Sequence, residues 1–216
     1  APAAADAKAM IAACKKAKVS LSVAFPCRFA PALVAAHDRI QAGQFGDIYA
    51  ASCTNHGSFP GGWFAQDELS GGGATMDHTV HVVDVLRYIL GKEFTSVFCE
   101  LGNQFHKKTI NTDDFGSVHM EMEGGTQISH LASWSRPKSF PTWGDVTIEF
   151  IGEKGVLNVD AFGQRVDLYN DEALKAQWIN WGANPNLNMI RNFVEGVAAR
   201  KPPTRCATGL DGLRAT

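Results

Sequence analysis

The sequence lacks a dominant charge and a long apolar run. It holds 20 basic and 22 acidic residues among 216, so its formal net charge is only −2. A balanced charge gives no reason to expect nucleic acid or an anionic membrane surface as a partner. No apolar run approaches the length of a membrane span. Charged residues also interrupt the first apolar pattern, which does not fit a secretory signal (Asp6, Lys8, Lys15 and Lys16).

Two common motifs are missing as well. The five cysteines are scattered and odd in number, and no two of them form a C-x-x-C pair. This usage predicts reduced structural thiols in an intracellular, cytoplasmic protein. No G-x-G-x-x-G stretch lies between a strand and a helix, so these residues offer no phosphate cradle for a dinucleotide.

The chain begins with a short helix–strand pattern and continues as a longer α+β pattern. Residues 1–18 have the spacing of an amphipathic helix, and residues 19–25 form a β-prone run. Next we expect a helix over 32–42, a strand over 48–56 and a loop rich in glycine, proline and aromatics over 56–70.

After residue 91 the pattern changes to β-prone runs with turn signals between them. These runs lie at 96–105, 116–123, 126–134, 145–151, 155–161 and 165–169. A helix is predicted over 186–200, and another begins at 209. The elements together predict an α+β fold, an open, mostly antiparallel sheet with helices on one face. Both ends look cut, so we expect a piece of a longer protein.

Residues 71–91, GGGATMDHTVHVVDVLRYILG, combine three glycines with a helical pattern. At about 100° per residue, Asp77, His81 and Asp84 fall on one narrow stripe, while Val83 and Leu86 fall on the opposite side. The glycines let the backbone approach something closely. A helix N-terminus also favours an anion or an electron-rich ligand oxygen.

Asp77 and His81, four residues apart, have the spacing of an acid–base pair. The carboxylate would hold one imidazole nitrogen, and the other would exchange a proton with a substrate hydroxyl. A solvated helix face explains the same stripe. A metal site using His78, His81 and a carboxylate is a further alternative, and Asp84 with Arg87 could form a surface ion pair.

Aromatic residues of the 56–70 loop suggest contact with a ring. Trp63 and Phe64 could stack on a sugar-like ring, or they could be core aromatics. His130 and Trp134 share strand parity, so both could face a pocket, and both could equally face water.

The central stretch resembles a motif of the Gfo/Idh/MocA oxidoreductases, the family of glucose–fructose oxidoreductase and inositol dehydrogenase. That motif has a glycine triplet, an Asp, a His four residues later and an Asp three further on, which residues 71–73, Asp77, His81 and Asp84 match. Further similar segments follow the family's order: VAFPCRFAP with its arginine–aromatic step at Arg28, IQAGQFGDIYAA, EFIGEKGVLNVD and GLDGLRAT.

The resemblance implies two domains. Residues 1–27 would be the last helix and strand of a Rossmann domain that binds NAD or NADP. Residues 28–216 would be the C-terminal α+β domain, with its last helix truncated, whose sheet commonly forms a homodimer or homotetramer interface. The nucleotide fingerprint and a catalytic lysine would lie upstream, so no cofactor is expected on this piece and its cofactor-binding residues are unknown.

The resemblance also implies roles for single residues. His81 would be the proton-transferring group and Asp77 its partner in a dehydrogenase acting on a sugar, inositol or related polyol. Asp84, His78, Trp63 and Arg28 would contact substrate, and His78 stands where the family commonly has small residues. No metal is expected. The alternatives are a non-catalytic nucleotide- or sugar-sensing or assembly domain and, third, a metal-dependent lyase or isomerase.

Overall fold

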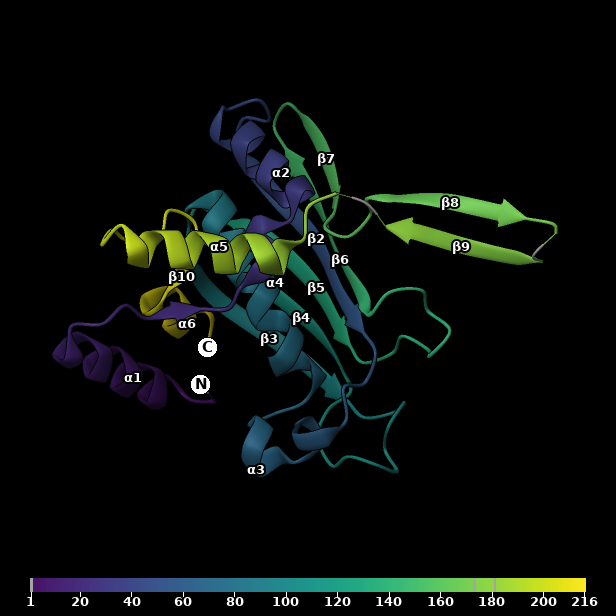
Figure 1. Cartoon of the computed structure of the whole chain (residues 1–216), viewed down its shortest axis with the longest axis horizontal. Helices are drawn as coiled ribbons and strands as arrows, with labels where there is room; N and C mark the ends of the chain where they lie inside the picture. Colours follow the sequence, from purple (N-terminus) through teal and green to yellow (C-terminus); the bar gives the residue numbers. More distant parts are fainter. Residues whose placement is uncertain (1, 173, 181) are drawn as a thin grey trace.

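The computed structural model describes residues 2–172, 174–180 and 182–216. Its centre is a six-stranded sheet in the order β3-β4-β5-β2-β6-β7 (Figure 1). Only β2 and β5 run parallel, and the other neighbouring strands are antiparallel, which confirms the mostly antiparallel sheet. The strands are β2 (Ile48–Gly57), β3 (Phe94–Gly102), β4 (Phe115–Met122), β5 (Thr126–Ser133), β6 (Gly144–Gly152) and β7 (Gly155–Asp160).

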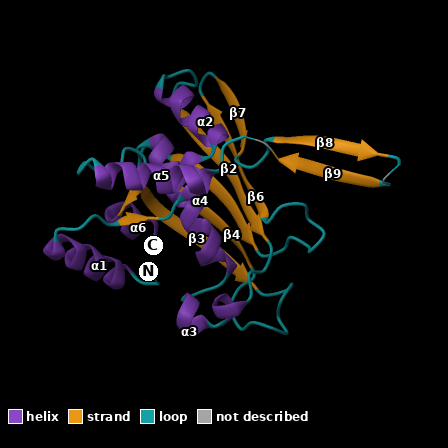
Figure 2. Cartoon of the chain, in the orientation of Figure 1, coloured by secondary structure: helices purple, strands orange, loops and turns teal. Residues whose placement is uncertain are grey.

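Three of the helices lie on one face of this sheet, as predicted. Figure 2 shows α2, α4 and α5 stacked on the same side, and α4 packs on β2, β4 and β5. Within the described ranges no helix combines the length and the apolar character needed to cross a bilayer. The helices are α1 (Ala4–Ala17), α2 (Pro31–Gln41), α3 (Asp67–Ser70), α4 (Ala74–Leu90), α5 (Pro185–Ala198) and α6 (Gly209–Ala215), with 3₁₀ turns η1 (Pro26–Phe29) and η2 (Gly62–Ala65).

The main core lies between α4 and the sheet. Side chains alternate along β2, so Ala51, Cys53 and Asn55 point inward and are buried, while Ser52 and Thr54 point to the open face. The apolar side of α4 covers them with Val82, Val85, Leu86 and Ile89. This packing fixes which side of α4 remains available for a site.

The first segment of the chain joins the last one. Strand β1 (Ser22–Val23) pairs antiparallel with β10 (Ala207–Thr208), and α6 packs against both α1 and α4. The run predicted as a strand over 19–25 is therefore shorter, because β10 pairs with only two of its residues. The division into domains at residue 28 stays a prediction.

A hairpin of β8 (Arg165–Asn170) and β9 (Lys175–Asn180) projects away from the sheet (Figure 1). The run at 165–169 is a strand as predicted, but it pairs with β9 and not with the main sheet. Strand β9 was not predicted, because its segment KAQWIN is short and its alternation of polar and apolar residues stops after four positions.

Candidate active site

Helix α4 begins at a cap supplied by the loop before β4. The carboxylate of Asp113 accepts hydrogen bonds from the backbone N–H groups of Gly73 at 3.1 Å and Thr75 at 2.7 Å, and its carbonyl accepts from Ala74 at 3.0 Å. A side chain at position 73 would collide with that carbonyl. The glycines were expected to let the backbone approach another group closely, and that group is Asp113. Its carboxylate occupies the N-terminus of α4, so this terminus is not free to bind a ligand anion.

Asp77, in the first turn of α4, is held in place by two neighbouring side chains. Trp134 Nε1–H donates to Asp77 Oδ2 at 3.0 Å, and His78 Nε2 lies 3.3 Å from the same oxygen. Burial acts to raise the pKa of Asp77, but the contacts with His78 and Trp134 outweigh it, and the pKa is lowered. Asp77 is thus an ionised carboxylate with a fixed orientation.

His81 lies one turn further along and makes few polar contacts. Its ring packs edge-on against Phe25, with centroids 5.6 Å apart, and its Nδ1 is buried without a hydrogen-bond partner in the described structure. Burial lowers the pKa of His81, and His78 adds to this effect while Asp77 opposes it. At neutral pH His81 is therefore a neutral imidazole, able to accept a proton.

The Asp77–His81 pair was expected to share a hydrogen bond, and the described structure shows none between them. Asp77 is bonded to Trp134, and its influence on His81 is electrostatic only. The alternative interpretation, that Asp77, His81 and Asp84 form a solvated helix face, does not fit either, because α4 is buried around most of its circumference.

Two cavities of about 480 Å³ each meet at His81. Asp77 and His81 both line the first, which opens between α4 and residues 21–25. Its apolar walls include Phe25, Trp63, Met76, Val80 and Leu213. His81 lines the second cavity together with Cys27, Asn55, Thr142, Trp143 and Phe162. The imidazole therefore separates a cavity beside the N-terminal segment from one at the ends of β2 and β6.

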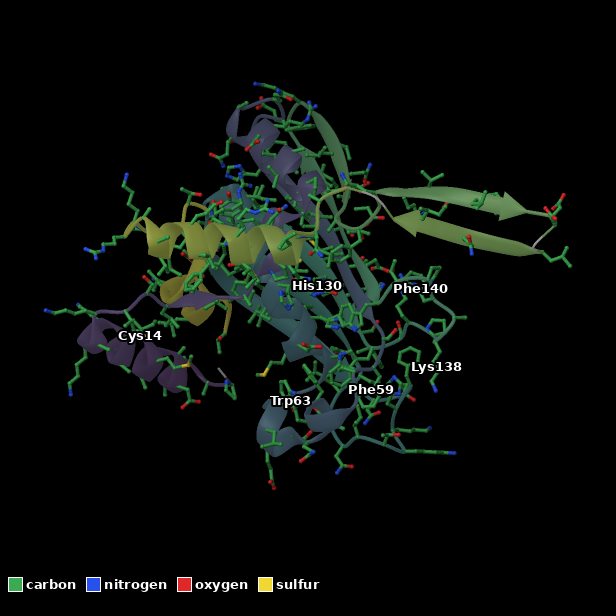
Figure 3. All side chains as sticks on the ribbon, in the orientation of Figure 1. Cys14, Phe59, Trp63, His130, Lys138 and Phe140 are labelled. Atoms are coloured by element: carbon green, nitrogen blue, oxygen red, sulfur yellow. The ribbon has the colours of Figure 1, made fainter. Side chains whose placement is uncertain are left out.

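Trp63 lies on the loop between β2 and α4, where Figure 3 also shows Phe59. Its indole is 52% exposed, stacks on Phe64 with centroids 3.9 Å apart and lines the first cavity. Phe59 and Phe64 both pack on the buried Trp134. The loop is thus anchored from inside, and Trp63 presents an aromatic face to the cavity, as required for contact with a ring.

His78 lies behind Asp77. Its side chain is only 1% exposed, and its Nδ1 lies 2.8 Å from the backbone carbonyl oxygen of Asn55. The ring packs edge-on against Trp143, and neither cavity at His81 has His78 in its lining. Direct substrate contact was expected of His78, but its burial leaves it no path to a ligand except through Asp77.

Arg28 and Asp84 form a buried ion pair. Arg28 donates to the two carboxylate oxygens of Asp84 at 2.7 and 2.6 Å, and Asp84 is fully buried. Neither residue lines the cavities at His81. We expected both to contact substrate, but the pair instead fastens η1 to α4. The alternative ion pair of Asp84 with Arg87 is wrong, because Arg87 binds Glu93 at 2.8 and 2.6 Å.

The sequence did not predict the roles of three residues that support the site, Asp113, Trp134 and Phe25. Strand parity predicted only that Trp134 shares a face with His130, and its bond to Asp77 spans 57 residues and has no local signal. Among the described residues, no group of three or more His, Cys, Asp or Glu side chains is arranged to hold a metal ion.

Comparison with known proteins identifies the family. Residues 33–158 match the model of the GFO/IDH/MocA C-terminal domain. The rhizopine catabolism protein MocA of Rhizobium meliloti is 32% identical over 92% of this chain and 57% of its own length. The NAD⁺-dependent scyllo-inositol 2-dehydrogenase of Bacillus subtilis is 31% identical over 70% of this chain and 43% of its own length.

Solved structures show the same fold. GenD2 from gentamicin A biosynthesis, solved in complex with NAD, superposes with a TM-score of 0.85 at 22% identity, over 99% of this chain and 63% of GenD2. The chain belongs to the GFO/IDH/MocA family. It spans about half the length of the curated relatives it matches.

Proposed function

We propose that the full-length protein is an NAD(P)-dependent dehydrogenase that acts on CH–OH groups of a sugar, inositol or related polyol. The observation that carries this proposal is that Asp77 and His81 line one cavity with residues 21–25. By resemblance to the family, those residues end the nucleotide-binding domain. Relatives named as inositol dehydrogenases support the substrate class.

The first cavity fits the nicotinamide end of such a cofactor. Its walls are mainly apolar, as an aromatic ring requires, and they include the imidazole of His81. When bound, the nicotinamide accepts or supplies the hydride. The fingerprint for its phosphates is absent from these residues, so we do not expect this chain alone to turn over substrate.

The chain's own residues supply proton transfer and orientation. We assign His81 to take the proton of the substrate hydroxyl during oxidation and to return it during reduction. Asp77, fixed by Trp134, orients the same hydroxyl and favours the protonated form of His81 after transfer. Trp63 offers its exposed indole to the face of a ring.

A substrate screen on the full-length protein tests this proposal. Sugars, inositols and sugar acids are supplied with NAD or NADP, and reduced nicotinamide is followed by its absorbance. We expect turnover with at least one cyclic polyol and a preference for one dinucleotide. Tight dinucleotide or sugar binding without any turnover would contradict the dehydrogenase and favour the non-catalytic sensing domain.

We further propose that the open face of the sheet joins two copies of the chain. Four strands present exposed apolar side chains on this face, Phe98, Leu131, Ile151 and Val156. An uncovered face of this width is rare in a monomer unless it binds a partner. The five free thiols fit a reducing compartment, so we place the protein in the cytoplasm.

A further inference from the structure

The ring of His81 is oriented without a hydrogen bond to its buried nitrogen. A histidine that transfers a proton through one ring nitrogen is usually held by a hydrogen bond to the other. In His81 the atom available for that role, Nδ1, is buried and has no partner in the described structure. The neighbouring carboxylate of Asp77 accepts from Trp134 instead. The direction of the imidazole is therefore set by packing.

Phe25 supplies the aromatic contact of this imidazole. The ring centroids of Phe25 and His81 lie 5.6 Å apart and the planes meet at 80°, an edge-to-face arrangement that aromatic pairs prefer. Phe25 is only 6% exposed, so its own ring has little freedom to move. Both side chains line the first cavity. The phenyl ring therefore limits rotation of the imidazole on the side of that cavity.

The backbone that carries Phe25 is anchored on the side of the preceding strand. Ser22 and Val23 pair with β10. The N–H of Phe25 donates to the carbonyl of Val23 at 3.0 Å. The next residue is Pro26, which restricts the backbone conformation of the residue before it. Phe25 thus enters the site on a short, rigid segment.

A buried ion pair anchors the other side of this segment. Arg28 donates two hydrogen bonds to the carboxylate of Asp84, at 2.7 and 2.6 Å, and the two side chains are 6% and 0% exposed. Water competes little for such a pair. Arg28 follows Phe25 by three residues, and Asp84 follows His81 by three residues. The ion pair therefore ties the segment with the phenyl ring to the part of α4 with the imidazole.

We propose that Phe25 is a positioning residue for His81 and that the Arg28–Asp84 ion pair acts through Phe25. The ion pair holds the phenyl ring against the imidazole, and the phenyl ring holds the imidazole between the two cavities. Neither Arg28 nor Asp84 lines those cavities, so their effect on a ligand is indirect. A consequence for catalysis rests on the proposed function, whereas the orientation of the ring does not.

The orientation is tested in the full-length protein without turnover. Relaxation of ¹³C-labelled histidine measures how rigidly the His81 ring is held. Phe25→Leu keeps an apolar side chain but removes the ring edge, so the order parameter of His81 should fall. The control is Phe29→Leu, which removes another buried phenyl ring from η1 and should leave the order parameter unchanged. Equal order parameters for His81 in the two variants would overturn the proposal.

The role of the ion pair is tested by a double-mutant cycle on kcat. Phe25→Leu and Asp84→Asn should each lower kcat by roughly three- to thirtyfold and leave KM for the polyol nearly unchanged, because they displace a proton-transferring group. Since the ion pair acts through Phe25, the double variant should lose little more than the larger single loss. Losses that multiply would contradict the proposal.

Arg28→Lys keeps the charge but not the two parallel hydrogen bonds. It takes the place of Asp84→Asn in the cycle if thermal unfolding shows that Asp84→Asn is not folded, and the same outcomes apply. An unmodified full-length protein that turns over no polyol would contradict the proposed function, while the order parameters would still decide how His81 is held.

Discussion

At the scale of single residues, the site differs from a simple acid–base dyad. Asp77 has partners behind it, Trp134 and His78, while His81 keeps a ring nitrogen without a partner. That nitrogen, Nδ1, is buried, so a proton exchanged with a ligand would pass through the other ring nitrogen, Nε2. A group meant to orient that ligand benefits from being fixed. These contacts therefore favour orientation of the ligand by Asp77 and proton transfer by His81.

Trp134→Phe tests the support of Asp77. The phenyl ring still packs against Phe59 and Phe64, but the hydrogen bond of 3.0 Å to Asp77 is lost. A hydrogen bond to a charged group contributes about 1.5–3 kcal/mol, so kcat/KM should fall by roughly ten- to a hundredfold. Steady-state kinetics measure the effect, and the thermal midpoint shows whether packing survives. Unchanged kinetics in a folded variant would exclude this role for Trp134.

At the scale of elements, residues 71–91 show what a pattern predicts and what it cannot. Helical spacing gave the helix, its end at Gly91 and one stripe of titratable groups. It could not show that Asp84 is buried against Arg28, because that partner lies 56 residues away. It could not show either that Asp113 caps the helix from a loop 38 to 40 residues downstream. Period and propensity are local, and these contacts are not.

The cap of α4 predicts a stability effect. Asp113→Ala removes the carboxylate that accepts from Gly73 and Thr75, so the free energy of unfolding should fall by about 1–2 kcal/mol. Urea unfolding at neutral pH measures the change. Asp171→Ala, at an exposed turn, is the matched control and should change little. Equal losses of unfolding free energy in the two variants would show that Asp113 does not cap α4.

His130, on strand β5, makes the free energy of unfolding depend on pH. Burial lowers the pKa of His130 to about 4, against an ordinary value of 6.5. Between these values the unfolded chain binds a proton that the folded chain does not, so stability falls as the pH drops through this window. The loss amounts to about 3 kcal/mol.

His130→Leu tests this term, because it removes the titrating ring but keeps an apolar side chain in the core. Unfolding free energies of both proteins are compared between a pH of about 7 and about 5. The unmodified protein should lose more stability over this range than the variant. Identical pH dependence would show that His130 does not titrate as described.

At the scale of the whole molecule, the sequence predicted the α+β class, the order of the main elements and the family. The hairpin of β8 and β9 was not predicted as a separate unit, because strand propensity does not say which strand is the partner. The parallel pairing of β2 with β5 is likewise invisible locally, since it joins residues from before and after α4.

Assembly through the open sheet face predicts a change in oligomeric state. Leu131 lies in register with Thr54 and Ser117 near the middle of that face. Leu131→Glu would place charges of the same sign on both copies, so the protein should become monomeric in sedimentation experiments. Leu187→Glu, exposed on α5, is the control. An unchanged oligomer in both variants would place the interface elsewhere.

The central claim is that His81 transfers a proton in a dehydrogenase completed by an upstream nucleotide domain. Its most direct test is kcat of the full-length His81→Ala variant with the polyol found in the screen. The matched control is His37→Ala, on α2 away from the cavities. We predict that kcat falls by about two to four powers of ten for His81→Ala, with dinucleotide affinity nearly unchanged, and stays near normal for His37→Ala. Near-normal turnover by His81→Ala would contradict the account.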